Sequence, residues 1–154
     1  MFEILRIQAE EKLEQVRNLF REYAESLEFH LDFQDFEGEM KNLPGEYAEP
    51  TGCLFLAVHE DQAVGCGALR KIEEGICEMK RLYVKPEFRN LRIGKTLAEV
   101  LINKARMLGY AQMRLDTVPS MEKARKLYTT LGFREIGAYR YNPIEGAIFM
   151  ELDL

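Results

Sequence analysis

The sequence predicts an α+β fold of mixed α/β character, with helices on both faces of a mixed, mostly antiparallel sheet of about seven strands. Seven short runs with strand-like composition are separated by segments of helical periodicity. Three of these runs follow one another with only tight turns between them, which predicts an antiparallel meander. A helix then joins the third run to the next one, which requires a parallel crossover. The length of 154 residues suits one domain spanning residues 1–154.

The N-terminal quarter is predicted to be a strand followed by helices. Residues Phe2–Ile7 alternate in polarity, as strands do. Apolar residues then recur at helical spacing and predict a helix over about Glu10–Ser26. Glu28–Phe36 is rich in aromatic residues and is expected to be extended. A short helix after it should end at Pro44–Gly45.

The predicted meander occupies the middle of the chain. Its strands are expected at Cys53–His59, Ala63–Ile72 and Ile76–Val84, with turns at residues 60–62 and 73–75. On the third strand, the alternation of side chains predicts Glu78, Lys80, Leu82 and Val84 on one face, and Met79, Arg81 and Tyr83 on the other.

After Pro86 the period changes to that of a helix. An apolar stripe from Ile93 to Leu108 predicts a helix that Gly109 terminates. A strand is expected at Ala111–Thr117 and a helix at Met121–Leu131, stopped by Gly132. Strands at Phe133–Ile136 and Ala147–Leu152, with a loop over residues 139–146 between them, complete the chain.

Composition excludes several classes of protein. With 47% apolar and 31% charged residues, the chain is neither disordered nor of low complexity. No apolar run is long enough to span a membrane, and the first residues do not resemble a signal peptide, so a cytoplasmic protein is expected. Cys53, Cys66 and Cys77 are too few and too widely spaced for a disulfide framework or zinc cluster, and we expect buried thiols and no metal.

The net charge of −5 is unevenly distributed. Residues 1–77 hold 7 basic and 17 acidic residues, residues 78–106 hold 8 and 3, and residues 107–154 hold 6 of each. A basic segment within an acidic protein indicates a small anionic ligand rather than nucleic acid. The alternative, a solvated helix face that happens to be basic, is equally compatible with composition.

The basic segment contains the clearest candidate site. Leu82–Thr96 combines a strand end, a loop with basic residues and a helix start, where unpaired N–H groups and the helix dipole favour phosphate. Gly94-Lys95-Thr96 matches the end of a P-loop. That motif requires a glycine at position 89, where this chain has Arg89, which argues against a nucleotide-binding module.

Two signatures in the second half resemble a known family. Arg89-Asn90-Leu91-Arg92-Ile93-Gly94 matches the pattern Arg/Gln-x-x-Gly-x-Gly/Ala except at Arg92. Ala124-Arg125-Lys126-Leu127-Tyr128-Thr129-Thr130-Leu131-Gly132-Phe133 matches Ala-x-x-Leu-Tyr-x-x-Leu-Gly-Phe throughout. The two signatures occur in this order along the chain, and the predicted strands and helices succeed one another as in a known family. Residues 78–151 therefore resemble the GNAT superfamily of acyl-CoA-dependent N-acetyltransferases. Their fold is a sheet splayed in the middle.

The resemblance implies acetyl-CoA as cosubstrate and direct transfer of its acetyl group to an amine. The pantetheine arm would lie between the splayed strands, bonded to the backbone of Leu82 and Val84, where an N–H would polarise the thioester carbonyl. The pyrophosphate would lie on Arg89–Thr96. The implied cofactor-binding residues are Leu82, Tyr83, Val84, Arg89, Asn90, Leu91, Arg92, Ile93, Gly94, Lys95 and Thr96.

Two residues depart from the family pattern. Arg92 stands where members carry their first glycine, which permits close approach to phosphate. Its guanidinium could bind the pyrophosphate, or the side chain could point to solvent. Met121 stands where many members have an asparagine, so that asparagine's polar contact is not carried over.

The matching tyrosine of the family is the acid near the thioester sulfur, so Tyr128 is the candidate general acid. The alternative is a tyrosine packed in the core. Glu78 is the candidate base, acting directly or through water, because an acid inside an apolar strand beside the splay would have a raised pKa if buried. The alternative for Glu78 is a salt bridge to a lysine.

The acceptor is expected to be a small-molecule amine, a lysine or an N-terminal amine. Residues 22–49 contain nine acidic residues and one basic residue, Lys41, and an acidic wall would attract a cationic amine; a solvated acidic surface is the alternative. Five aromatic residues would line the acceptor pocket or cap the core: Phe29, Phe33, Phe36, Tyr139 and Tyr141. A non-catalytic acyl-CoA sensor of the same fold, and a homodimer through the C-terminal strand, remain open.

Overall fold

The computed structural model, which describes residues 1–8, 10–27 and 35–154, confirms the predicted order of elements. The strands are β1 (Phe2–Arg6), β2 (Cys53–His59), β3 (Gln62–Glu73), β4 (Ile76–Val84), β5 (Gln112–Thr117), β6 (Arg134–Ile136) and β7 (Ile148–Asp153). The helices are α1 (Glu10–Ser26), α2 (Phe36–Asn42), α3 (Ile93–Met107) and α4 (Glu122–Leu131), with short 3₁₀ helices η2 (Gly45–Tyr47) and η3 (Pro86–Leu91). Most of the segment expected to be extended, residues 28–34, lies outside the described residues, and Phe36 already belongs to α2.

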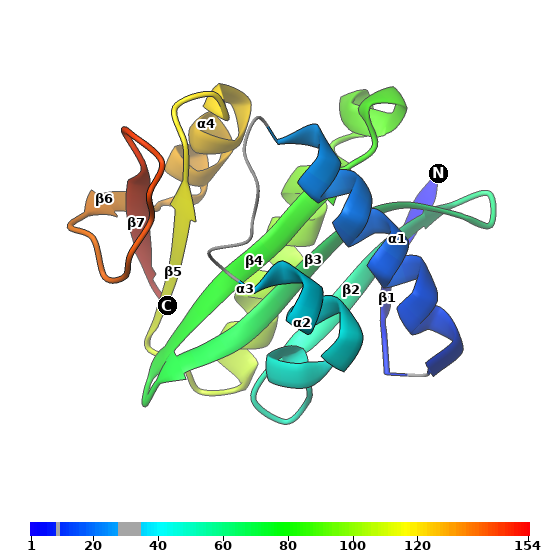
Figure 1. Cartoon of the computed structure of the whole chain (residues 1–154), viewed down its shortest axis with the longest axis horizontal. Helices are drawn as coiled ribbons and strands as arrows, with labels where there is room; N and C mark the ends of the chain where they lie inside the picture. Colours follow the sequence, from blue (N-terminus) through cyan, green and yellow to red (C-terminus); the bar gives the residue numbers. More distant parts are fainter. Residues whose placement is uncertain (9, 28–34) are drawn as a thin grey trace.

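All seven strands form one sheet in the order β1-β2-β3-β4-β5-β7-β6. The meander is confirmed, because β2, β3 and β4 pair antiparallel along the chain. The crossover is also confirmed, because β4 and β5 form the parallel pair (Figure 1). Strand β7 pairs with β5 along one edge and with β6 at Phe149–Glu151 along the other, and the dimer through the C-terminal strand stays a prediction.

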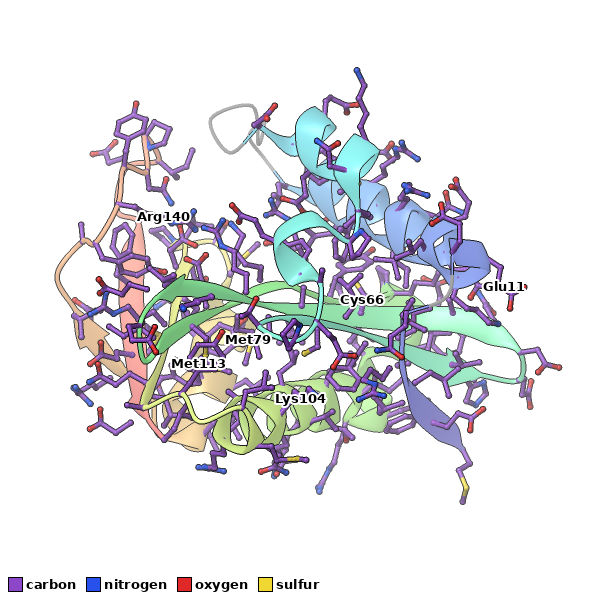
Figure 2. The ribbon with its side chains drawn as sticks, turned by 90° about the horizontal axis from the view of Figure 1, so that it is seen from below. Glu11, Cys66, Met79, Lys104, Met113 and Arg140 are labelled. Carbon is purple, nitrogen blue, oxygen red and sulfur yellow. The ribbon has the colours of Figure 1, made fainter. Side chains whose placement is uncertain are left out.

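Helices cover both faces of the sheet, as predicted (Figure 2). Helix α1 buries Leu13, Val16, Leu19 and Phe20 together with α2 against one face. Helix α3 buries the stripe that includes Leu97 against the opposite face, in a cluster to which α4 contributes Tyr128. These apolar faces repeat at the helical period, which is why the sequence predicted both long helices correctly.

A bulge in β4 corrects the predicted alternation of its side chains. Cys66 pairs with Tyr83 and Ala68 with Lys80, so two residues of β4 oppose the single residue Gly67. Arg81, one of the two, has a left-handed backbone with φ of 59°. The extra residue reverses the facing of the side chains beyond it in β4.

As a result, Met79 lies on the α3 face together with Leu82 and Val84, whereas the alternation predicted Met79 opposite those two. Tyr83 lies on the α1–α2 face. Glu78 and Lys80 are therefore separated from Leu82 and Val84.

The three cysteines are free and buried, as expected. Burial raises the pKa of both Cys53 and Cys77 to about 12, so these thiols stay protonated at neutral pH. Within the described residues, no group of three or more His, Cys, Asp or Glu side chains could hold a metal ion. No helix in that same part of the chain is long and apolar enough to cross a membrane.

Candidate active site

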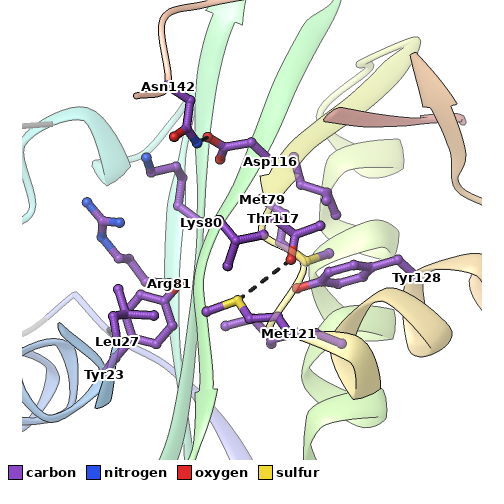
Figure 3. A pocket seen from close by; sticks show the side chains of 14 residues that line it. Tyr23, Leu27, Met79, Lys80, Arg81, Asp116, Thr117, Met121, Tyr128 and Asn142 are labelled. Carbon is purple, nitrogen blue, oxygen red and sulfur yellow. Dashed lines mark hydrogen bonds between the residues drawn. The ribbon is translucent and has the colours of Figure 1, made fainter. Parts of the chain in front are cut away.

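A pocket opens where β4 and β5 part. The two strands pair only from Ile76–Glu78 to Gln112–Arg114 and then diverge (Figure 1). Side chains from α1, β4, β5, α4 and the loop before β7 surround the gap (Figure 3). We call this cavity the splay pocket; it is lined by Tyr23, Leu27, Met79, Lys80, Arg81, Leu82, Leu115, Asp116, Thr117, Val118, Met121, Ala124, Tyr128 and Asn142.

Helix α4 brings Tyr128, the predicted acid, to this pocket. The helix ends at Gly132, whose φ of 105° suits glycine, and Phe133 then packs edge-on against the Tyr128 ring. The Tyr128 hydroxyl points into the splay pocket (Figure 3). Burial raises the pKa of Tyr128 above its usual value of 10. The phenol therefore carries its proton at neutral pH and can donate it.

Met121 lies beside Tyr128 in the pocket wall. The Thr117 hydroxyl donates to the Met121 sulfur at 3.6 Å, the contact drawn dashed in Figure 3. The pocket is thus apolar at the position where many members of the resembled family carry an asparagine.

The loop between β6 and β7 is held to the sheet through Asp116. Arg140 Nη2 donates to Asp116 Oδ1 at 2.6 Å, and Asn142 Nδ2 donates to Asp116 Oδ2 at 3.0 Å. The Asp116 side chain is 11% exposed and lies at the end of β5. Two donors from one loop thus fix the carboxylate of Asp116, a residue that lines the pocket.

Glu78, the predicted base, is fully buried but does not line the splay pocket. Its carboxylate accepts from Arg70 Nε at 2.7 Å, lies 3.2 Å from Arg140 Nη2 and accepts a short hydrogen bond from the Tyr139 hydroxyl. The partners are therefore two arginines and a tyrosine rather than a lysine. Its role as a base stays a prediction, and its position does not favour that role.

Two cations of β4 also line the pocket. Arg81 makes a bidentate ion pair with Glu39 at 2.7 and 3.0 Å and lies 5.5 Å over the Phe36 ring. Lys80 is buried, and burial together with the neighbouring Arg81 guanidinium lowers the pKa of Lys80 to about 7. These buried charges connect the β4 bulge to helix α2.

A loop rich in basic residues follows β4, and we call residues 85–96 the basic loop. It consists of the short helix η3, then Arg92 in the left-handed conformation with φ of 62°, then the start of α3. Thr96 N–H is the first to bond within α3, to the Arg92 carbonyl. The amides of Ile93, Gly94 and Lys95 precede it, at the helix end where N–H groups lack intrahelical acceptors.

The predicted binding residues of the basic loop differ in what they expose. Asn90, Leu91, Arg92 and Lys95 are exposed, whereas the Ile93 side chain is fully buried in the core. Ile93 therefore presents only its backbone. The Thr96 hydroxyl donates to the Arg92 carbonyl at 3.0 Å, so it is engaged within the helix. The 3₁₀ helix before Gly94 is not the glycine-rich loop that a P-loop requires.

Arg89 is oriented by contacts with the end of β4. Its Nε donates to the Val84 carbonyl at 2.9 Å, and its guanidinium lies 5.6 Å over the Tyr83 ring. The Tyr83 hydroxyl donates to Glu22 at 2.7 Å, and Lys85 pairs with the same carboxylate at 2.8 Å. The side chain of Tyr83 thus supports Arg89 from the α1 side of the sheet.

The acidic segment is largely paired where the structure describes it. Glu22 pairs with Lys85, Glu39 with Arg81, Glu46 with Arg70 and Glu49 with Lys104. These four carboxylates neutralise cations of the sheet and α3, and whether the segment attracts a cationic amine stays a prediction.

Sequence reasoning missed several residues that line the splay pocket. Asp116, Asn142 and Lys80 are far apart in the sequence, and nothing in their local context distinguishes them from surface residues. Of the two loop tyrosines, Tyr139 packs against Phe149, whereas Tyr141 is 74% exposed. A possible signal was the position of Asp116 near the end of a strand beside the expected splay.

Comparisons with known proteins agree with this geometry. A family model described as "Acetyltransferase (GNAT) family" matches residues 13–133. An uncharacterized N-acetyltransferase of Dictyostelium discoideum is 33% identical over 96% of this chain and 97% of its own length, and one of Schizosaccharomyces pombe is 36% identical over 92% and 88%. The structure of PaiA N-acetyltransferase from Thermoplasma acidophilum in complex with coenzyme A has a TM-score of 0.77, covers 100% and 99% of the two chains, and is 19% identical, so this likeness shows the fold alone.

Proposed function

The chain belongs to the GNAT family of acetyltransferases, and from that premise we propose that it transfers an acetyl group directly from acetyl-CoA to a primary amine. The acceptor would be a small-molecule amine, a lysine side chain or an N-terminal amine. The observation that carries the proposal is the splay pocket, into which the Tyr128 hydroxyl points at the place where β4 and β5 part.

The residues present fit acetyl-CoA. Beyond Glu78, β4 has no ladder partner on its β5 side among the described residues, so its backbone there could receive an extended pantetheine arm near Leu82 and Val84. The basic loop offers the amides of Ile93, Gly94 and Lys95 to the pyrophosphate, at the positive end of the α3 dipole. Arg89, Arg92 and Lys95 would supply the charge. These assignments rest on the family and on the local geometry.

The chemistry then requires two proton movements. An alkyl amine has a pKa of about 10 and must lose a proton before its nitrogen attacks the thioester carbon. The departing thiolate must gain a proton, and Tyr128 is proposed to supply it. A backbone N–H of β4 near Leu82 would stabilise the oxyanion that forms between these events.

A catalytic role is favoured over a non-catalytic sensor. The relatives from Dictyostelium discoideum and Schizosaccharomyces pombe are named as N-acetyltransferases, and the tyrosine that an acid role requires is present and faces the pocket. A cytoplasmic location and an assembly of two copies stay predictions.

The proposal is tested by turnover. Purified protein is mixed with acetyl-CoA and a panel of alkyl amines, amino acids, peptides with free N-termini and lysine peptides, and release of the CoA thiol is followed. Calorimetric titration with CoA measures binding separately. Thiol release that depends on one class of amine supports the function and names the acceptor. Binding of CoA without release for any amine would instead favour the sensor, and absence of binding would contradict the whole assignment.

A further inference from the structure

Among the described residues that line the splay pocket, Asp116 provides the one carboxylate. Tyr128, the proposed acid, lines the same pocket from α4, whereas Asp116 lies at the end of β5 (Figure 3). A cationic acceptor that enters this pocket therefore meets a carboxylate there, and that carboxylate is not Glu78.

The contacts of Asp116 leave it able to accept more hydrogen bonds. An ionised carboxylate has about four acceptor positions. Arg140 occupies one on Oδ1 and Asn142 one on Oδ2. The remaining positions suit the three N–H donors of a primary ammonium.

Glu78 differs from Asp116 both in its place relative to the pocket and in its unused acceptor positions. It is fully buried, and its two oxygens already receive Arg70, Arg140 and the Tyr139 hydroxyl. Arg140 Nη2 lies 3.2 Å from Glu78 and 2.6 Å from Asp116, so one guanidinium joins both carboxylates across the gap between β4 and β5. Glu78 therefore holds Arg140, and Arg140 in turn holds Asp116.

We propose that Asp116 is the catalytic carboxylate that binds the acceptor ammonium and takes its proton, and that Glu78 and Arg140 are positioning residues that hold Asp116 in place. The inference rests on the proposed acetyl transfer.

In this step one proton moves from the ammonium to the Asp116 carboxylate and then to water. The nitrogen lone pair forms the C–N bond to the acetyl carbon, and the C–S bond breaks with its electron pair on sulfur. Tyr128 protonates that sulfur, and the second proton of the nitrogen replaces the one that Tyr128 gave.

Other charged and titratable groups around the pocket contribute to the electrostatic potential at Asp116. They are Arg140 and Tyr139 on the loop, Tyr128 on α4, Tyr23 on α1, and Lys80 and Arg81 on β4. Because the pKa of the pocket residue Lys80 is lowered to about 7, a pH profile alone would not identify the base. The test therefore varies the pKa of the acceptor instead.

The experiment uses an alkyl amine that the wild type acetylates and its fluorinated analogue, whose low pKa leaves it neutral at the assay pH. Asp116→Asn should lower kcat/KM for the alkyl amine by roughly 10²-fold or more, the usual contribution of a general base. The analogue needs no deprotonation, so its kcat/KM should fall by about tenfold or less. Asp116→Glu should recover part of the activity with the alkyl amine. Glu78→Gln should lower kcat/KM for the alkyl amine more than for the analogue, because Glu78 acts through Arg140 on the position of Asp116.

Asp153→Asn is the matched control, because that carboxylate also accepts from an arginine and an amide, Arg134 at 3.0 Å and Gln112 at 3.1 Å, but does not line the pocket. It should leave kcat/KM unchanged. CoA titration and a thermal melt establish that each variant is folded. If Asp116→Asn does not fold, the comparison of the two amines is made with Asp116→Glu instead.

Equal losses for both amines in Asp116→Asn, or no loss, would overturn the assignment while acetyl transfer stands. The assignment would also fall if Asp116→Glu showed equal losses for both amines. No turnover by the wild type with any amine would overturn both.

Discussion

The basic loop and the splay pocket are built in different ways. The basic loop is one continuous stretch, residues 85–96, and its features follow from where β4 ends and α3 begins. The splay pocket collects side chains from five parts of the chain, between Tyr23 and Asn142. The proposed donor site is therefore local in sequence, whereas the pocket proposed for the acceptor depends on long-range packing.

The two regions also differ in how their charges are held. Arg92 and Lys95 of the basic loop are exposed, and solvent screens exposed charges. Around the splay pocket, Arg81, Glu78 and Asp116 are buried or nearly so and are paired. Substitutions in the basic loop should therefore weaken binding moderately. Substitutions around the pocket should affect catalysis or stability strongly.

The largest effect is expected from Tyr128→Phe. Loss of the proton donor should lower kcat by roughly 10²–10⁴-fold, because the thiolate would then leave unprotonated. The aromatic packing against Phe133 is kept, so stability and CoA affinity should change little. Steady-state kinetics and calorimetry measure the two quantities, and a kcat within threefold of wild type would remove Tyr128 from the mechanism.

The next effect concerns the buried ion pair behind the pocket. Glu39→Gln leaves the Arg81 guanidinium, 3% exposed, without a countercharge and should lower the free energy of unfolding by about 3–5 kcal/mol. Glu14→Gln breaks an exposed i,i+3 pair with Arg17 and should cost about 0.5 kcal/mol or less. Urea denaturation compares the two variants, and similar losses would show that burial of the pair is unimportant.

In the basic loop, Arg89→Ala should weaken CoA binding about 10- to 100-fold, the effect of removing a charge-assisted hydrogen bond. Arg106→Ala, at the opposite end of α3, is the control and should leave the dissociation constant unchanged. Calorimetry measures both variants. If the two variants bind CoA with equal affinity, the pyrophosphate does not lie on Arg89.

Lys80 gives the stability a defined pH dependence. Its pKa is about 7 in the folded protein and about 10.4 when unfolded, so between these values the unfolded chain binds the additional proton. Stability should therefore rise with pH above 7, by at most about 1.4 kcal/mol per pH unit from this group.

In Lys80→Met this contribution disappears. The buried thiols act in the opposite direction in both proteins, so the difference between wild type and variant isolates Lys80. Urea denaturation at pH 6.5, 7.5 and 8.5 measures it, and a difference that does not vary with pH would contradict the lowered pKa.

The smallest effect is expected at Arg92. A non-glycine residue at φ of 62° is disfavoured, so Arg92→Gly should raise the free energy of unfolding by about 0.5–1 kcal/mol. CoA titration of the same variant decides between the two alternatives for this side chain. Unchanged affinity means that only the backbone serves the phosphate, and weaker binding assigns a contact to the guanidinium. A loss of stability would contradict the strain argument.

Sequence alone determined the order of elements and the basic loop. Helices α1 and α3 have apolar faces at the helical period, the meander has tight turns, and Gly132 follows the last residue of α4. Each of these features could be predicted from residues that are close together in the sequence. Tyr128 was also found from sequence, because it lies within a continuous motif. The sequence explained the family's glycine at the position of Arg92 by close approach to phosphate, and the structure adds that this residue is left-handed before α3.

Only the tertiary structure decided which carboxylate faces the pocket. The bulge at Arg81 reverses the facing of the strand beyond it, and bulges leave no periodic signal in one strand because they arise from pairing with another. The partners of Glu78 and Asp116 come from β3, across the turn that precedes β4, and from the loop before β7, which lies 24 or more residues away in the chain. A carboxylate's chemistry depends on what donates to it and on whether solvent reaches it, and both are properties of packing rather than of local sequence.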